Sequence, residues 1–409
     1  MRPILPLLLL AACAAAADKP FTLLTDELLA GLPAAEQKEW SSFIAASRER
    51  AAGERRILDE ECRRAGLGRP RPAPGGRKEF EFDSDTPPEW FGGADNLRLA
   101  ETVISYQTPS GGWSKAVDYG KGPRRPGTHW TAQTGDAWHY CGTFDNRTTT
   151  EQIKFLAGVF TATGREDVRA ALLKGLGYVF AAQYPNGGWP QNYPVERGYH
   201  EAITLNDDAM THVLELLLSV SQGVRLFTFA DEPLKQRARA AFDKGVACLA
   251  AMQVKADGKP TVWCAQHHPL TLEPVKARLK EPPSLSGGES ASLVKFLMRS
   301  GPVTPEVVTM IESAMAWFDS HRITGLRKTK NAAGRTDFVT DPASTEVHWA
   351  RFYDLQTGRP IFAGADDGII YGSFSEMAAK NKVAYDFFSS RPRVLFEKEL
   401  PRWRKRLQK

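Results

Sequence analysis

A repeated pattern of Gln, three residues and Gly-Gly-Trp constrains the fold of this chain more than any other feature. The pattern spans Gln107–Trp113 and Gln183–Trp189, and a weaker copy combines Gln253 with Trp263. Each copy follows a segment whose apolar residues have helical spacing, and the copies lie roughly 70 to 76 residues apart. A period of that length is typical of architectures in which each repeat contributes a pair of helices.

Short polar turns alternate with the Gly-Gly-Trp loops. Asp145 lies in the first turn, Asp207 and Asp208 lie in the second, and Glu289 lies in the third. Each turn precedes an amphipathic run, where acidic and capping residues satisfy the N–H groups at the start of a helix. The order of helix, Gly-rich loop, polar turn and helix therefore occurs about three times, and strand patterns are few and short.

These repeats predict an all-α fold. We expect an (α/α) toroid or barrel of about three helical-hairpin repeats, because alternating helices can close into a ring that buries their amphipathic faces. One rim would then collect the Gly-Gly-Trp loops and the acidic turns. An open helical solenoid, which is built from the same repeats, is the competing arrangement.

The region before the first repeat is predicted to form a helical arm. Thr25 can cap a helix that starts at Asp26, and residues 33–64 carry apolar side chains at helical spacing. Residues 66–79 are rich in Pro, Gly and Arg, which marks a linker. We therefore divide the chain into a signal peptide at 1–17, an arm with its linker at 18–80, and the toroid at 81–409.

The start of the chain predicts export. Arg2 is followed by an apolar run from Ile4 to Ala12, which is too short to span a bilayer and is typical of a signal peptide. We favour a lipoprotein box that ends at Cys13, and ordinary cleavage after Ala17 is the alternative. The mature protein would be periplasmic, attached to the cell surface or secreted, with membrane contact only through the possible lipid.

Composition narrows the classes of partner. Apolar residues make up 42% and charged residues 25%, which is typical of a globular protein. Lys and Arg form no long run, so we expect no nucleic acid as partner, and the net charge of +5 suits an acidic polymer. The remaining cysteines have no CxxC spacing, which argues against zinc and leaves disulfides and buried thiols both open. They are Cys62, Cys141, Cys248 and Cys264.

The polar residues alone leave their roles open. Carboxylates at helix starts usually act as caps, but Asp145, Asp207 and Asp208 in equivalent turns could converge and bind Ca²⁺ through oxygen. His267 and His268 could bind a metal, although a solvated or hydrogen-bonded pair is the favoured interpretation because no third ligand has suitable spacing. The tryptophans of the repeat could stack on sugars, but we favour a role in locking the helix pairs.

Several longer motifs together resemble one family. They occur in order over roughly residues 88–375, and their length makes a chance match remote. The chain is similar to the pectate lyases of polysaccharide lyase family 10 in SYQTPSGGWSK, TFDNRTTTEQIKFLA, QYPNGGWPQNYP, ITLNDDAM, WCAQHHPLTLEPVKARLKEPPSLSGGES and ARFYDLQTGRPIF.

The resemblance implies an α/α toroid that cleaves polygalacturonate by β-elimination with the help of Ca²⁺. Asp145 and Asp207 match residues that hold calcium or lie beside it, and Arg278 matches the arginine that acts as base. A bound Ca²⁺ would neutralise the uronate carboxylate and stabilise the enolate-like intermediate. Arginine is a poor base because its pKa is above about 12, so its surroundings would have to lower that pKa. The predicted substrate-binding residues are Lys115, Asp208 and Arg351.

The chain departs from the family at several positions. His268 stands where relatives usually have Asp, and Lys280 stands where they usually have Tyr. Ala365 aligns with an arginine that contacts a substrate carboxylate in the family. TFDN is followed by Arg147 instead of the usual Gly-Ala-Thr, and Ser114 replaces the proline of WPK. The loss of one arginine from the substrate groove puts the affinity for polygalacturonate in doubt.

Three functions follow from these observations. The first is a calcium-assisted pectate lyase that works as a monomer on polygalacturonate. The second is a related toroid lyase that acts on another uronate glycan. The third is a non-catalytic surface lipoprotein that binds acidic polysaccharide.

Overall fold

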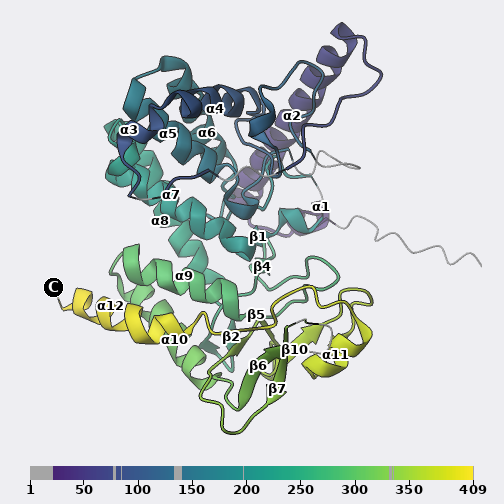
Figure 1. The fold of residues 1–409 in the computed structure, drawn as a ribbon, viewed down its shortest axis with the longest axis vertical. Coiled ribbons are helices and arrows are strands. Elements are labelled where there is room, and N and C mark those ends of the chain that lie inside the picture. The colour runs from purple at the N-terminus through teal and green to yellow at the C-terminus, as the bar shows by residue number, and fades with distance from the viewer. Residues whose placement is uncertain are drawn as a thin grey trace, which may run out of the picture.

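The computed structural model describes residues 22–76, 80–83, 85–132, 141–196, 198–330, 334 and 336–408. The chain forms a helical part up to Ser320 and a smaller strand-bearing part that follows it, and the last two helices of the helical part lie at the lower end of the long axis beside most of the strands (Figure 1). The predicted signal peptide, with Cys13 in its lipoprotein box, lies outside the described residues. Export and lipidation therefore stay predictions.

Three antiparallel helix pairs form the helical part, and α4 (Ala94–Ser105) packs beside the first of them. Each pair is joined by a short loop, so its apolar faces meet in one continuous core. The pairs are α5 (Thr150–Thr163) with α6 (Glu166–Ala181), α7 (Ala209–Gln222) with α8 (Glu232–Ala251), and α9 (Gly287–Ser300) with α10 (Pro305–Ser320).

The repeated tryptophans lock these helices rather than face the solvent. The indole Nε1 of Trp113 donates to the carbonyl of Val103 at 2.8 Å, and Trp189 makes the equivalent bond to Val179 at 2.9 Å. Both indoles are at most 1% exposed. Each ring thus fixes a loop to the end of the helix before it, which leaves no face free for a sugar.

The repeated glutamine and glycine complete the same joint. The Gln183 amide donates to Gly187 O in its own loop at 3.0 Å and to Ala241 O in α8 at 2.9 Å. Gly187 has a φ of +97°, and a Cβ there would lie 2.2 Å from Lys244 O. Only glycine therefore allows the loop to approach α8 so closely.

The N-terminal helices are packed firmly on this core. Thr25 caps α1 (Asp26–Ala30) by accepting from Leu28 N at 3.3 Å, and α2 (Ala34–Arg64) is the longest helix. Trp40 on α2 lies 5.0 Å from the Tyr184 ring between centroids. The buried Glu54 side chain accepts from Ser110 N at 3.1 Å, in the first Gly-Gly-Trp loop. A shorter helix, α3 (Pro88–Phe91), packs against α5.

The prediction of an all-α toroid is wrong. The described residues contain strands in five sheets, and the largest has the order β11-β10-β9-β5. Most strands have only two residues, which is too short for an alternating pattern to be visible in the sequence. They are β1 (Ile203–Thr204), β2 (Lys255–Ala256), β3 (Lys259–Pro260), β4 (Gln266–His267), β5 (Leu285–Ser286), β6 (Leu326–Lys330), β7 (Thr336–Thr340), β8 (Trp349–Ala350), β9 (Phe352–Tyr353), β10 (Pro360–Ala363), β11 (Ile370–Tyr371) and β12 (Phe388–Ser389).

The strands after α10 have a small core of their own. Phe352, Phe362 and Phe374 pack together there, with α11 (Phe374–Lys380) covering the sheet. The chain then returns along α9 and ends in a π-helical turn, η7 (Leu395–Glu399), and α12 (Leu400–Leu407). This part has no counterpart of the Gly-Gly-Trp loop, and it replaces the further helices that a closed ring would need.

Two other predictions concern the described residues. All four of their cysteines are buried free thiols, so the alternative with disulfides does not hold for them. No helix that the structure describes is long and apolar enough to cross a membrane.

Candidate active site

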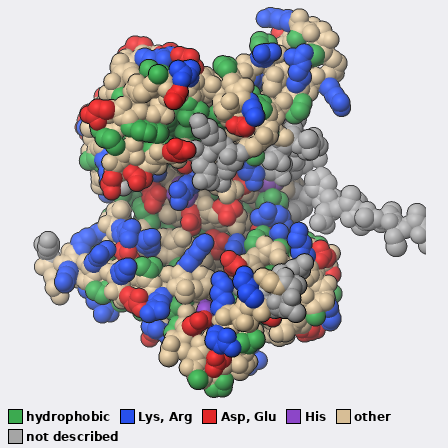
Figure 2. Space-filling view, viewed as in Figure 1, with side chains coloured by type: hydrophobic (Ala, Val, Ile, Leu, Met, Phe, Trp, Pro, Cys, Tyr) green, Lys and Arg blue, Asp and Glu red, His purple; other side chains and the backbone are tan. Residues whose placement is uncertain are grey.

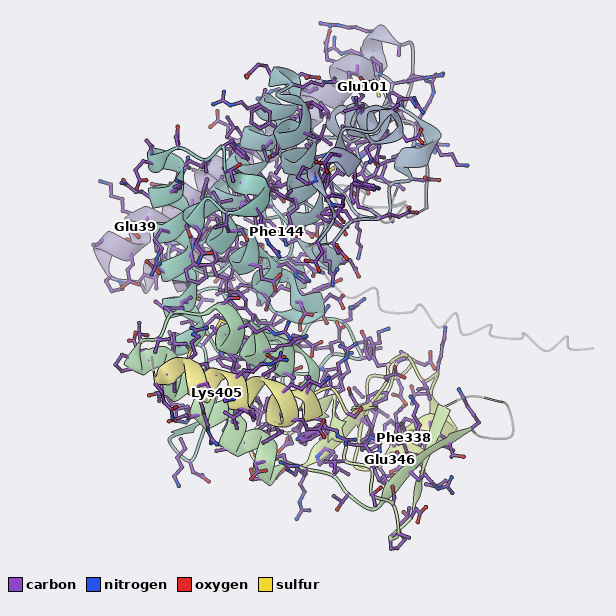
Figure 3. All side chains as sticks on the ribbon, turned by 60° about the vertical axis from the view of Figure 1, so that its left-hand side comes forward. Glu39, Glu101, Phe144, Phe338, Glu346 and Lys405 are labelled. Carbon is purple, nitrogen blue, oxygen red and sulfur yellow. The ribbon has the colours of Figure 1, made fainter. Side chains whose placement is uncertain are left out.

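A hollow separates the helical part from the strand-bearing part, and acidic and basic side chains gather in it (Figure 2). Phe144, which directly precedes Asp145, lies at the middle of the molecule near this junction (Figure 3). Two short turns at the starts of α5 and α7 face the hollow from the helical part. They are η3 (Asp145–Arg147) and η5 (Asn206–Asp208).

Asp145 is buried and forms an ion pair with Lys115, which follows the first Gly-Gly-Trp loop. Thr143 Oγ1 accepts from the Asp145 backbone N–H at 3.1 Å and fixes the turn. The second carboxylate oxygen of Asp145 is buried without a hydrogen-bond partner. A buried acceptor without a partner is costly, so this oxygen is poised to bind a cation or a donor.

Asp207 lies beside Asp145, because η3 and η5 are in contact. The loss of water around its carboxyl group, with the charges of Asp145 and Glu289, raises the pKa of Asp207 to about 6. Asp207 and Asp208 have φ values of +52° and +60°, a strained conformation for residues other than glycine. Neither Asp145 nor this pair makes a side-chain cap bond to the following helix. The capping interpretation of these aspartates is therefore wrong.

Arg351 lies between β8 and β9 and reaches the acidic turns from the strand-bearing part. Its Nη2 donates to Glu289 Oε1 at 3.1 Å and contacts Asn206 Oδ1 at 3.5 Å. Its guanidinium also lies 4.1 Å above the centre of the Tyr385 ring. Glu289 and Tyr385 thus hold Arg351 against η5.

Arg278 is held by Glu281, which also accepts a hydrogen bond from the same tyrosine. Its Nε and Nη2 donate to the two carboxylate oxygens of Glu281 at 2.8 and 2.7 Å. The Tyr385 hydroxyl donates to Glu281 Oε1 at 2.5 Å, and Lys280 Nζ lies 4.6 Å from the Tyr385 ring centre. The hydrogen bonds from Arg278 to Glu281 raise the pKa of the arginine above its usual value.

The fold thus brings most of the residues expected from the sequence into one row. Lys115, Asp145 and Asp207 are in direct succession, and Arg351 follows through Asn206. Arg278 is connected to Arg351 only through other side chains. Asp208 lies apart from the row, because its carboxyl group faces the side chains of His212 and Ser292.

Sequence reasoning missed the residues that connect the row. Glu281 could have been found, because it follows Arg278 by three residues within a quoted motif. Glu289 was noted only as a helix-start residue, although it binds Arg351. Tyr385 had no local signal, since it lies beyond all the motifs and reaches the site only through tertiary packing.

The two histidines make hydrogen bonds within the protein. His267 Nε2 accepts from Cys264 N at 3.0 Å, and its Nδ1 is bonded to Leu272 O at 2.8 Å. Burial lowers the pKa of His267 to about 4. His268 Nδ1 accepts from the backbone at Leu270 and Thr271. The prediction of a hydrogen-bonded pair is therefore confirmed.

The part of the chain that the structure describes has no group of three or more His, Cys, Asp or Glu residues arranged to hold a metal ion. The facing carboxylates of Asp145 and Asp207 nevertheless fit one side of a calcium site, because Ca²⁺ prefers oxygen ligands. The Asp145 oxygen without a partner is one such ligand. Water and a carboxylate from outside the protein would have to supply the others.

Comparison with known proteins agrees with the motifs. The family model for pectic acid lyase matches residues 107–395. The solved structure of a family 10 polysaccharide lyase from Cellvibrio cellulosa is 29% identical, with a TM-score of 0.64, over 78% of this chain and 98% of that one. A mutant of a family 10 lyase from Cellvibrio cellulosa, in complex with trigalacturonic acid, is 30% identical, with a TM-score of 0.63, over 75% of this chain and 94% of that one.

A search among proteins of curated function finds no match. The family model nevertheless covers more than half of the chain. The chain therefore belongs to the pectic acid lyases, polysaccharide lyase family 10, and is a lyase enzyme.

Proposed function

We propose that this enzyme cleaves polygalacturonate by calcium-assisted β-elimination. The observation that carries the proposal is the row of opposite charges, in which Asp145 and Asp207 face each other while Lys115 and Arg351 lie at either end. Such a row can bind a cation and the carboxylates of an acidic sugar chain together. The complex of a related lyase with trigalacturonic acid supports this class of substrate.

Asp145 and Asp207 would hold the calcium ion. The ion, when bound, would neutralise the carboxylate next to the carbon that loses its proton. Desolvation, and after it the nearby charge of Asp145, raises the pKa of Asp207, and a cation between the two carboxylates would relieve their repulsion. Lys115 already neutralises one Asp145 oxygen, so the other oxygen is the one available for the ion.

The cations of the site would bind and orient the polymer. Arg351 is fixed by Glu289 and by the Tyr385 ring, so its guanidinium is held in place before the substrate arrives. Lys115 has one described carboxylate partner and lies at the edge of a small cavity of about 180 Å³. Both groups are suited to carboxylates on neighbouring sugars.

Arg278 is the proposed base, and its surroundings in the unbound enzyme oppose that role. Its bidentate ion pair with Glu281 raises its pKa, so it carries its proton in this state. The proposal therefore requires the substrate complex to weaken that pair before Arg278 takes the proton from carbon. Three variants separate the possibilities: Arg278→Ala removes both base and charge, Arg278→Lys keeps the charge, and Glu281→Gln weakens the ion pair.

The test is turnover of polygalacturonate with Ca²⁺, followed by the ultraviolet absorbance of the unsaturated product. We expect product from the wild type, loss of product with a chelator, and at least about a 1,000-fold fall in kcat for Arg278→Ala. If Arg278→Ala retained the wild-type rate, the base would have to be another group. No product with or without calcium would reject the proposed activity.

A second candidate is cleavage of a different uronate glycan. The turn between β10 and β11 carries Ala365 where the resemblance implies a substrate-binding arginine, and Gly368 of this turn packs on Leu279 beside Arg278. The change therefore lies next to the proposed base. Assays on a panel of uronate polymers test this candidate, which predicts faster turnover of another polymer and a gain on polygalacturonate from Ala365→Arg.

We further propose that residues 18–80 form an arm and that residues 81–409 form the catalytic unit of an exported monomer. Trp40 and Glu54 pack on the Gly-Gly-Trp loops, which supports an arm that stabilises the repeats. The net charge supports an acidic polysaccharide as the partner. Labelling with a lipid precursor, compared between the wild type and Cys13→Ala, tests the proposed lipoprotein signal.

A further inference from the structure

A second cavity, of about 510 Å³, lies beside the candidate active site. It runs along α5 and α7, from Arg147 before α5 to η6 (Arg225–Phe227) after α7, and the carboxylates of Asp83, Glu151 and Glu215 line it as well. Its volume falls within the range of about 300 to 1,000 Å³ that is usual for small-molecule sites. The proposed reaction makes no use of this space.

Arg147 supplies a cation to this cavity at the cost of backbone strain. It is the last residue of η3 and has a φ of +64°, a conformation that costs a non-glycine residue on the order of 1 kcal/mol or more. Within the described parts of the chain, its exposed guanidinium has no hydrogen-bond or ion-pair partner. The strain thus places an unpaired positive group in the wall of the cavity.

Lys154 adds a second cation from the next turn of α5. Its Nζ is 4.0 Å from Glu215 Oε2, and that oxygen is also 3.2 Å from His212 Nδ1. Burial, and the nearby charge of Arg147, lower the pKa of Lys154, while Glu215 and Glu151 act in the opposite direction. Lys154 is therefore only loosely paired with Glu215, which His212 already engages, while Glu151 also lines the cavity.

We propose that this cavity binds a uronate residue of the polymer, with the carboxylate of the sugar between Arg147 and Lys154. This inference rests on the proposed function and adds a binding site to it. Guanidinium and ammonium groups both make charge-assisted hydrogen bonds to carboxylates, and the half-buried Phe82 ring suits the C–H face of a sugar.

The cavity and the active site share a wall. Asp145 and Arg147 belong to the same three-residue turn, and the charge of His212 in the cavity acts on Asp208 of the next turn. One polymer could therefore place a sugar in the cavity while its next sugars lie along the row of charges. The glycine that relatives usually have after TFDN carries no such cation, so the site would distinguish this chain from them.

The experiment compares the wild type with Arg147→Gly and Arg147→Lys on polygalacturonate. Glycine accepts a φ of +64° without strain, so the first variant should fold at least as well as the wild type. The control is Arg165→Ala, because Arg165 pairs with Glu101 and Asp167 at the start of α6 and does not line the cavity. KM, kcat and the melting temperature are measured for each.

We expect Arg147→Gly to raise KM about tenfold with kcat unchanged, Arg147→Lys to restore part of the affinity, and Arg165→Ala to change neither constant. An unchanged KM in Arg147→Gly would overturn the proposal. If the wild type had no turnover, the proposed function would fail separately. Retardation of the same proteins in a gel containing polygalacturonate would then decide the binding site, because it measures affinity without catalysis.

Discussion

The helical repeats and the strand-bearing part contribute to the active site in different ways. The repeats supply carboxylates by the same device twice, in η3 before α5 and in η5 before α7, each with residues at positive φ. The strand-bearing part supplies Arg351 and Tyr385, each once and each through tertiary packing. Repetition thus builds the acidic side of the site and places Lys115 beside it, whereas Arg351 depends on contacts that no repeat encodes.

The largest effect is expected on the acidic side. Asp145→Ala should lower kcat/KM for polygalacturonate by at least about 1,000-fold, because it removes a proposed calcium ligand and leaves Lys115 without that carboxylate. The matched control is Asp231→Ala, since Asp231 caps α8 by accepting from Leu234 N at 3.0 Å, far from the site. The control should lose about 1 kcal/mol of stability and keep its activity. Equal activity loss in both variants would contradict a special role for Asp145.

The two parts also differ in how far the sequence predicts them. The Gly-Gly-Trp copies predict helix pairs because one residue pattern makes the same hydrogen bonds each time, as Trp113 and Trp189 do. The strands near Arg351 are two residues long, so their pairing depends on neighbours distant in sequence. The error of an all-α toroid came from extending the repeat into a region whose residues do not repeat.

The residues of the active site also differ in how far the sequence predicts them. Asp145, Asp207 and Arg278 lie in motifs long enough to be matched to a family, and the sequence identified them in that way. Glu289 and Tyr385, which hold Arg351, could not be assigned because contacts between residues distant in sequence depend on the fold. Glu281 could be picked out as a neighbour of Arg278 in the same motif, but its effect on the arginine could not, since spacing by three residues in a loop does not predict a bidentate ion pair.

The next largest effect is expected where a Gly-Gly-Trp loop packs closely against a helix. Gly187→Ala should destabilise the protein by roughly 3 kcal/mol, because the new methyl group would lie 2.2 Å from Lys244 O at a φ of +97°. Chemical denaturation measures the change. Gly258→Ala, also at a positive φ but with nothing within 4 Å, separates backbone strain from the clash and should cost only about 1 kcal/mol.

A smaller effect is expected for the tyrosine of the strand-bearing part. Tyr385→Phe keeps the ring under Arg351 but removes the hydroxyl that donates to Glu281 at 2.5 Å. We expect kcat to fall about tenfold with KM nearly unchanged, because Glu281 then holds Arg278 less precisely. Tyr371→Phe is the control, since its hydroxyl also donates to a carboxylate, Asp367, at 2.6 Å. A change in KM alone would assign Tyr385 to substrate binding instead.

The smallest effect tests whether close packing is confined to the positions where the repeat makes contacts. Gly175 and Gly177 lie two residues apart on α6, but a Cβ at Gly175 would lie 2.9 Å from Ile153 and 3.0 Å from the Trp113 ring, whereas one at Gly177 meets nothing within 4 Å. Gly177→Ala should therefore stabilise the protein by about 0.5 to 1 kcal/mol, because alanine is the better helix former. Gly175→Ala should destabilise it, since the indole that joins two helices would have to move. If both variants were stabilised, Trp113 would not be the rigid joint that its hydrogen bond to Val103 indicates.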